Sequence, residues 1–178
     1  MNVEFIKSEI DKCDIHTKRI QSALAHTQHL RPFTPQKVEN FTEEEISFIE
    51  LLTNRFSKLQ DTIGEKIFPC LLQLLFEYEV KDSMQDRLNK LEKLEILDSV
   101  GYWAKMREMG NIISHEYPDI PDLMSKNLNA VVEYAMELMN FWVRLRGIVI
   151  SKIRVAGNGA GFSDGSIWGF GSVDGGSK

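Results

Sequence analysis

The chain has 178 residues, of which 43% are hydrophobic and 26% charged, as is usual for one globular domain with or without a tail. A formal net charge of −5 excludes a globally basic nucleic-acid-binding protein, although it leaves room for a local basic patch. Cys13 and Cys70 lie far apart and match no metal spacing, which excludes a disulfide framework and fits a reducing cytoplasm. The polar N-terminal segment contains no signal peptide, and no apolar run approaches the roughly 18 residues of a membrane helix. We therefore expect a cytoplasmic protein without a membrane partner.

The N-terminal segment has the apolar spacing of an amphipathic helix. Apolar or small residues recur at steps of three and four, namely Ile6, Ile10, Cys13, Thr17, Ile20 and Leu24. This pattern predicts a helix over about residues 2–30. Pro32 and Pro35 end it, because proline lacks the amide hydrogen that the helix needs.

The second predicted helix begins with a strong start signal. Thr42 and Glu45 have the spacing of a capping box, and Phe41 and Ile46 flank them as a hydrophobic staple. The apolar stripe then continues past Gly64 and Pro69, which interrupt it. This favours one kinked helix reaching Phe76 or beyond over two separate helices.

Three more helices follow in the pattern. Ser83 with Asp86 opens a short one that carries Leu88, Leu91, Leu94 and Leu97. Asp98 or Ser99 caps a fourth, which runs to about His115, and Pro121 with Asp122 opens a fifth that continues to about Arg154. No segment alternates like a strand, so the sequence predicts an all-α, up-and-down bundle of four to five helices over residues 1–155.

The remaining segment, residues 156–178, has a different composition. Eight of the 12 glycines lie at or after Gly157, and charges are few. This composition predicts a flexible tail, either a disordered terminus or an extension foreign to the domain. Its aromatic residues Phe162, Trp168 and Phe170 are unusual there and could contact a partner.

Most chemical motifs are missing, and His115 is the histidine of interest. His16, His26 and His29 all lie on the first helix, and we interpret them as structural or surface residues. On the fourth helix, Arg107, Asn111 and Ser114 share one face with Val100 and Trp103, and His115 lies at its edge. The face changes from apolar to polar along the helix, which indicates either a wet cleft or a buried polar network.

The segment from Asn111 to Tyr117, N-I-I-S-H-E-Y, resembles the signature of the HEPN superfamily, and most closely that of HepT-like toxins. That signature is an arginine, a polar residue that is often asparagine, and a histidine four to six residues after the arginine; in HepT a tyrosine follows two residues later. Arg55 to Asp61, continued to Phe68 and Pro69, also looks like the long second helix of a HepT subgroup. The resemblance covers about residues 1–150 and implies an HEPN-like bundle.

One position departs from the signature. Gly110 stands where the family has its arginine, and Arg107 is eight residues before His115, outside the usual spacing. A glycine inside a helix costs about 1 kcal/mol relative to alanine, and nothing in local folding explains it. Either the protein is a naturally inactive relative, or an active toxin has lost its arginine.

The resemblance implies a metal-independent endoribonuclease without cofactor. RNA supplies its own nucleophile, the 2′-hydroxyl; His115 transfers the proton, Asn111 orients, and the arginine missing at Gly110 would hold phosphate. Arg107 and Ser114 are supporting residues. In the family two protomers complete one cleft, which implies a homodimer.

Tyr117 has a separate role by resemblance. In HepT systems a small, MntA-like nucleotidyltransferase antitoxin transfers AMP to the tyrosine of the His-x-Tyr motif, here His115-Glu116-Tyr117. The alternative is a tyrosine that packs against the helix end beside Pro118.

Three hypotheses follow. The first is a toxin ribonuclease of a toxin–antitoxin pair, weakened or inactivated at Gly110. The second is a non-catalytic HEPN subunit that binds a minimal nucleotidyltransferase. The third is a helical interaction protein that binds a partner through its tail aromatics.

Overall fold

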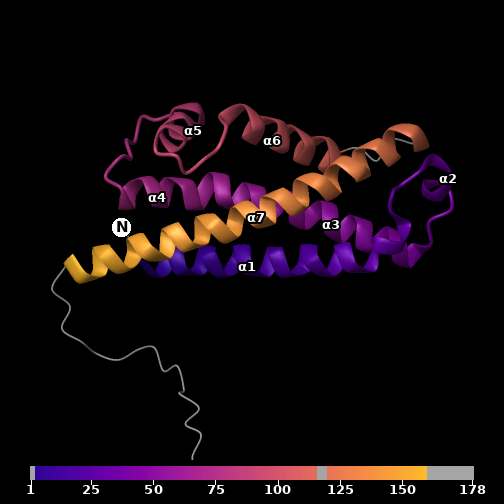
Figure 1. Ribbon diagram of the computed structural model, residues 1–178, viewed down its shortest axis with the longest axis horizontal. Helices are drawn as coiled ribbons and strands as arrows, with labels where there is room; N and C mark the ends of the chain where they lie inside the picture. Colours follow the sequence, from indigo (N-terminus) through magenta and orange to yellow (C-terminus); the bar gives the residue numbers. More distant parts are fainter. Residues whose placement is uncertain (1–2, 116–119, 160–178) are drawn as a thin grey trace, which may run out of the picture.

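The computed structural model of the chain describes residues 3–115 and 120–159, and the side chains of all of these except 113–115, 158 and 159. Every regular element in these two ranges is helical, which confirms the all-α prediction (Figure 1). The elements are α1 (Val3–His26), the 3-10 turn η1 (Gln28–Leu30), α2 (Pro35–Val38), α3 (Glu43–Thr62), the π-helical turn η2 (Ile63–Ile67), α4 (Phe68–Leu74), α5 (Met84–Lys93), α6 (Val100–His115) and α7 (Pro121–Gly159).

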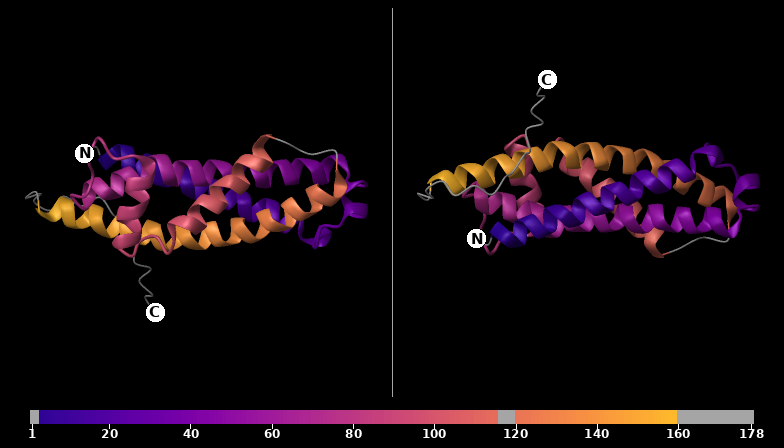
Figure 2. Two further views of the ribbon diagram at one scale, coloured as in Figure 1. Left: turned by 90° about the horizontal axis from the view of Figure 1, so that it is seen from above. Right: turned by 90° about the horizontal axis from the view of Figure 1, so that it is seen from below.

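The long helices run up and down. In Figure 1, α1 runs from left to right, the α3–α4 rod returns, α6 runs to the right again and α7 returns along the whole length. α7 contacts α1, α2, α3, α4 and α6, and α6 lies on α3 and α7 (Figure 2). The short α5 joins α4 to α6 at one end. This arrangement brings the C-terminal half of α6 onto the C-terminal half of α3.

Local capping accounts for where the helices begin. The Thr42 hydroxyl accepts from the Glu45 amide and the Glu45 carboxylate accepts from the Thr42 amide, so the predicted capping box is confirmed. Ser83 and Asp86 form the same reciprocal pair at α5. Of the two candidates at α6, Ser99 provides an oxygen, which accepts from the Tyr102 amide at 3.2 Å.

The helix ends differ in detail from the sequence prediction. The first helix ends at His26, and a 3-10 turn closes the segment before Pro32. α5 ends at Lys93, two residues before Glu95, whose φ of 56° lies in the left-handed region. α7 continues to Gly159, so the first four residues of the predicted tail are helical; the rest of that tail lies outside the described residues.

The predicted kinked helix is a continuous rod with a π-helical turn, but it ends at Leu74 and does not reach Phe76, whose φ of 59° lies in the left-handed region. The π-helical turn η2 lies between α3 and α4 and contains Gly64. A Cβ built on Gly64 would lie 3.4 Å from the Trp103 ring of α6. Proline at position 69 fits at the start of α4 because the π turn already interrupts the regular bonding. The wider turn thus seats a large aromatic side chain of the neighbouring helix.

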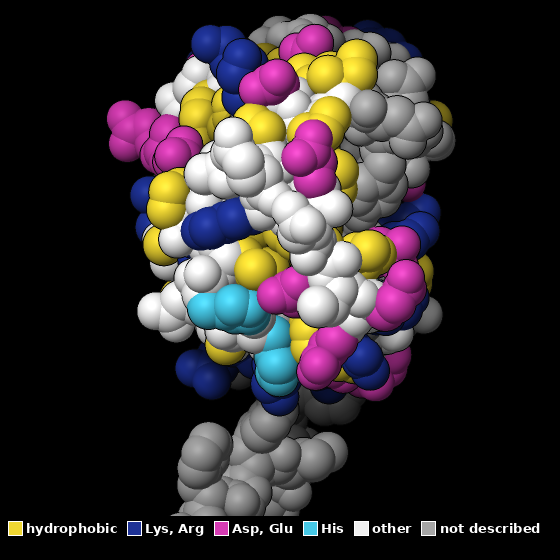
Figure 3. Space-filling view, turned by 90° about the vertical axis from the view of Figure 1, so that its right-hand side faces the viewer, with side chains coloured by type: hydrophobic (Ala, Val, Ile, Leu, Met, Phe, Trp, Pro, Cys, Tyr) yellow, Lys and Arg dark blue, Asp and Glu magenta, His cyan; other side chains and the backbone are white. Residues whose placement is uncertain are grey.

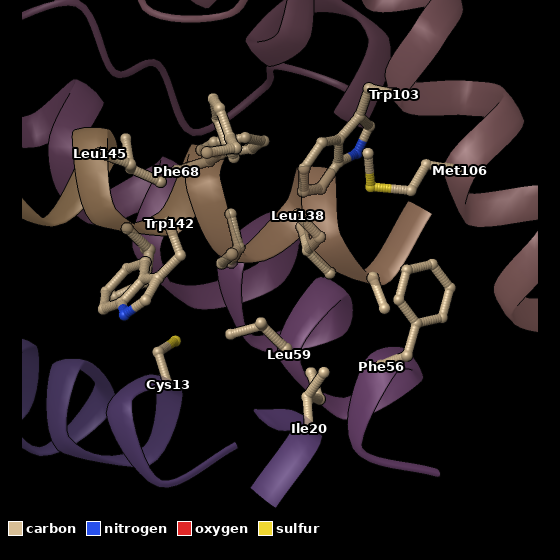
Figure 4. Close-up of a cluster of buried hydrophobic side chains, with 14 of the residues drawn as sticks. Cys13, Ile20, Phe56, Leu59, Phe68, Trp103, Met106, Leu138, Trp142 and Leu145 are labelled. Atoms are coloured by element: carbon tan, nitrogen blue, oxygen red, sulfur yellow. The ribbon is translucent and has the colours of Figure 1, made fainter. Parts of the chain in front are cut away.

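The core is one apolar cluster along the bundle axis. Figure 4 shows Cys13 and Ile20 of α1 near Trp142 of α7 and Leu59 of α3, while Phe68 of α4 and Trp103 of α6 lie on the opposite side of the cluster. Trp142 is buried, and its indole nitrogen donates to Asp14 Oδ1 at 2.8 Å, which satisfies its polar atom. Burial raises the pKa of both thiols, Cys13 and Cys70, which makes them unreactive packing residues.

None of the described helices is long and apolar enough to cross a membrane.

Candidate functional site

The motif residues lie on the last two turns of α6. The backbone is helical through His115, as the sequence predicts. The side chains of Ser114 and His115, and all of Tyr117, lie outside the described residues. Their predicted roles therefore rest on sequence, and the geometry below concerns Arg107, Gly110 and Asn111.

Gly110 lies where α6 packs closely against α3. It is buried, and a Cβ built on it would lie 3.2 Å from Gln60 Oε1, 3.5 Å from the Phe56 ring and 3.6 Å from Ser57 Oγ. The Ser57 hydroxyl also donates to the Gly110 carbonyl at 3.2 Å. The reason for a glycine here, which local folding did not provide, is therefore tertiary: it permits close contact between two helices.

A polar cleft opens beside this contact. It has a volume of about 230 Å³ and lies between α3 and α6. Its lining side chains carry amide, hydroxyl, ammonium and carboxylate groups, from Asn54, Ser57, Lys58, Gln60, Asp61 and Asn111, with Gly110 in its wall. Asn111 is exposed and faces this space, so of the two sequence alternatives the wet cleft describes it better than the buried network.

The face predicted for α6 is partly different in the structure. The buried stripe consists of Trp103, Met106 and Gly110, whereas Arg107 is exposed. Arg107 lines a small neighbouring cavity with Asp61, and these two charges attract each other. The reason for the difference is that the glycine, not a polar side chain, meets α3 at this level.

Asp61 contributes a carboxylate to the lining of both the cleft and the small neighbouring cavity. Burial and then the nearby Glu65 raise the pKa of Asp61, while Lys58 and Arg107 oppose the rise. The cleft therefore has a cationic side at Lys58 and an anionic side at Asp61.

A second cluster of polar and charged side chains, which the sequence patterns did not predict, lies where α1 and α3 pack together. His16 of α1 lies next to α3, with its Nδ1 3.5 Å from Arg55 Nη1. Burial lowers the pKa of His16, and the charges of Arg55, Lys58 and Arg19 lower it further. No spacing within one helix could reveal this group, because it forms only when α1 and α3 pack side by side.

The other two histidines of the N-terminal segment have structural contacts. His26 stacks on Phe48 with ring centroids 3.9 Å apart, and His29 Nε2 lies 2.9 Å from a Glu45 carboxylate oxygen. Figure 3 looks onto this end of the molecule, where Lys and Arg side chains are interspersed with Asp and Glu. These contacts agree with the structural interpretation of both residues.

A separate groove of about 380 Å³ lies between the start of α6 and the middle of α7. Its walls are mixed apolar and polar, with Tyr102, Asn140, Phe141 and Arg144 among them. It is distinct from the cleft at Asn111, which lies at the other end of α6.

Within residues 3–115 and 120–159, no three His, Cys, Asp or Glu side chains are grouped closely enough to hold a metal ion. Comparison with protein-family models, with curated proteins and with solved structures finds no match to this chain.

Proposed function

We propose that the chain is an HEPN-like, HepT-type protein that takes RNA into the cleft between α3 and α6, and that Gly110 makes it a weak or inactive ribonuclease. One observation supports this most directly. Asn111, the polar residue of the motif, lines an open polar cleft with Lys58, while the residue before it lacks a side chain. The site thus has orienting and cationic groups but no guanidinium at the motif position.

RNA cleavage of this kind needs few protein groups, because the RNA provides the nucleophile. The RNA 2′-hydroxyl attacks the adjacent phosphorus, the 5′-oxygen leaves, and a histidine moves the proton. His115 follows Asn111 by one turn of α6, and this spacing supports giving that task to His115. The step then lacks a bidentate cation on the phosphate, a charge-assisted contact worth roughly 1.5–3 kcal/mol in the ground state.

The proposal includes a homodimer, because each chain has one motif histidine, His115, and in the family two protomers share one cleft. Apolar side chains are exposed on neighbouring outer surfaces of α6 and α7: Tyr102 is 37% exposed, Met136 48% and Val143 66%. Met136 and Val143 are seven residues apart and so lie on one stripe of α7. Such a stripe is suited to pairing with a second copy.

The test is RNA cleavage by purified protein, together with growth on expression. We expect little cleavage by the natural chain and a gain with Gly110→Arg, because the cleft has room beyond the Cβ for a long side chain if Gln60 shifts. Adding His115→Ala to Gly110→Arg should abolish the gain.

Gly110→Gln is the matched control, since it adds a similar length without charge. Equal activity of the glutamine and arginine variants would contradict the role assigned to a cation at this position. Cleavage by the natural chain at the rate of Gly110→Arg would contradict the proposed weakness.

A second candidate is a non-catalytic HEPN subunit that partners a minimal, MntA-like nucleotidyltransferase. The burial of Gly110 against Gln60 and Phe56 favours it, because a residue used for helix packing need not replace a lost catalytic group. A nucleotidyltransferase encoded by a neighbouring gene, given ATP and magnesium, should add AMP to Tyr117. Tyr117→Phe should abolish the mass gain and Gly110→Arg should not; modification at Tyr102 or Tyr134 instead would contradict this candidate.

A further inference from the structure

Three cations surround one histidine on the surface where α1 and α3 pack together. His16 and Arg19 lie one turn apart on α1, and Arg55 and Lys58 lie one turn apart on α3. Arg55 Nη1 is 3.5 Å from His16 Nδ1. We call these four residues, His16, Arg19, Arg55 and Lys58, the cationic cluster.

The cations of the cluster form no close ion pair in the part of the chain that the structure describes, although Lys58 attracts the carboxylate of Asp61 one turn along α3. No carboxylate oxygen there lies within 4 Å of a charged nitrogen of Arg19, Arg55 or Lys58, whereas Lys12 on the same α1 is paired with Glu9 at 2.6 Å. Arg55 Nε is moreover buried without a hydrogen-bond partner. In an acidic chain, Arg19 and Arg55 thus keep positive charge that no close ion pair to the described residues neutralises.

The imidazole of His16 adds a hydrogen-bond donor to the cluster. Arg55 can only donate, so His16 Nδ1 accepts, and the neutral ring carries its hydrogen on Nε2. A lowered pKa, caused by burial and then by the three cations, keeps the ring neutral near pH 7. The cluster thus presents two guanidinium groups, an ammonium and a ring N–H donor, all of which suit phosphate oxygens.

Lys58 connects the cluster to the cleft. Its side chain belongs to the group around His16 and also lines the cleft with Asn54 and Asn111. The cationic side of the cleft therefore continues across α3 onto α1, away from Asp61.

We infer that the cationic cluster binds phosphodiester groups of an RNA strand that enters the cleft, and so supplies from α1 and α3 the phosphate contacts that position 110 cannot make. This inference rests on the proposed function and specifies its substrate contact. The spread of the cluster over two helices and its continuity with the cleft favour a polymer with successive phosphates over a single free phosphate.

The test is fluorescence anisotropy with a labelled 12-nucleotide 2′-O-methyl RNA, which lacks the nucleophile and cannot be cleaved. Arg55→Gln should weaken binding about 10-fold, the loss expected for one charge-assisted contact. Lys58→Gln and Arg19→Gln should each weaken it several-fold, and each loss should reduce the slope of log affinity against log salt by roughly 0.7. Lys18→Gln on α1 and Lys66→Gln on η2 are controls of equal charge change at exposed positions and should leave both quantities unchanged.

Arg55 is half-buried, so its variant is paired with a thermal unfolding scan; Arg19 and Lys58 are exposed and test the site even if Arg55→Gln unfolds. Equal losses in the cluster and control variants would overturn the inference, because they would show an unspecific charge effect. Competition by millimolar inorganic phosphate without any variant effect on RNA binding would overturn it too, in favour of a free-phosphate site. RNA binding that depends on the cluster, in a protein whose Gly110→Arg variant never cleaves, would support the inference while rejecting the ribonuclease proposal.

Discussion

The lowered pKa of His16 links its protonation to the stability of the fold. Burial lowers its pKa first, and the charges of Arg55, Lys58 and Arg19 lower it further. The unfolded chain, whose histidine keeps its ordinary pKa near 6.5, therefore takes up the proton at a higher pH than the folded chain. The contribution of His16 to stability is then complete above that pH and is lost as the pH falls toward the lowered pKa of the folded state.

Replacing His16 with glutamine should remove this pH dependence. Between about pH 7.5 and about pH 5.5, the natural chain should lose more unfolding free energy than His16→Gln, because only the natural chain must protonate a ring among cations. Urea unfolding at both pH values measures the difference, and the carboxylates cancel because both proteins carry them. Equal losses would show that the cations do not act on His16 in solution.

At the scale of elements, two glycines bring α6 close to the α3–α4 rod. The Trp103 ring of α6 lies against Gly64, and Gly110 of α6 lies against Phe56 and Gln60 of α3. Each glycine thus gives space to a side chain of the opposite helix, and the cleft begins where this contact ends.

A double-mutant cycle between Gly110 and Gln60 tests this contact. Gly110→Ala alone should be close to neutral, because the gain of about 1 kcal/mol in helix propensity is offset by the 3.2 Å approach to Gln60 Oε1. With Gln60→Ala present, the same change should stabilise by about 0.5–1 kcal/mol more. Chemical unfolding of the four proteins gives the coupling, and simple additivity would contradict the close contact.

Patterns among neighbouring residues predicted the helices and their caps, but they could not predict the contacts between helices. Thr42–Glu45 and Ser83–Asp86 are caps read within four residues, and both are confirmed. The π turn at Gly64 and the burial of Gly110 depend on Trp103 and Gln60 of the opposite helices, which no local pattern contains.

The candidate site divides in the same way. Asn111 could be placed on a polar face from helical spacing alone, and it does line a cleft. His16 and Arg55 are 39 residues apart in the chain and meet only through helix packing, so their proximity could not be predicted. The roles of His115, Ser114 and Tyr117 stay predictions.

At the scale of the whole molecule, charge and apolar surface are separated. A chain of net charge −5 has a cationic cluster on α1 and α3, while exposed apolar residues lie on α6 and α7. The proposed dimer would use the second surface and leave the first for RNA.

We expect a homodimer at micromolar concentration, and Val143→Glu should dissociate it by placing a charge within the apolar stripe of α7. Val155→Glu is the matched control, because Val155 is similarly exposed, at 69%, but lies near the end of α7 on another face. Light scattering measures the mass. A monomeric natural chain would contradict the dimer, and equal dissociation by both variants would contradict the surface assigned to it.

We propose above all that RNA occupies the cleft between α3 and α6. The most direct test is an NMR titration of the ¹⁵N-labelled protein with the 2′-O-methyl RNA, following the side-chain amides of Asn54 and Asn111, which line the cleft, and of Asn140, which lines the groove between α6 and α7. Asparagine-to-aspartate variants assign the three signals. We predict that the Asn54 and Asn111 amides shift together and saturate at one affinity while the Asn140 amide stays in place. Shifts confined to Asn140, or unchanged Asn54 and Asn111 signals at an RNA concentration that saturates anisotropy, would contradict the claim.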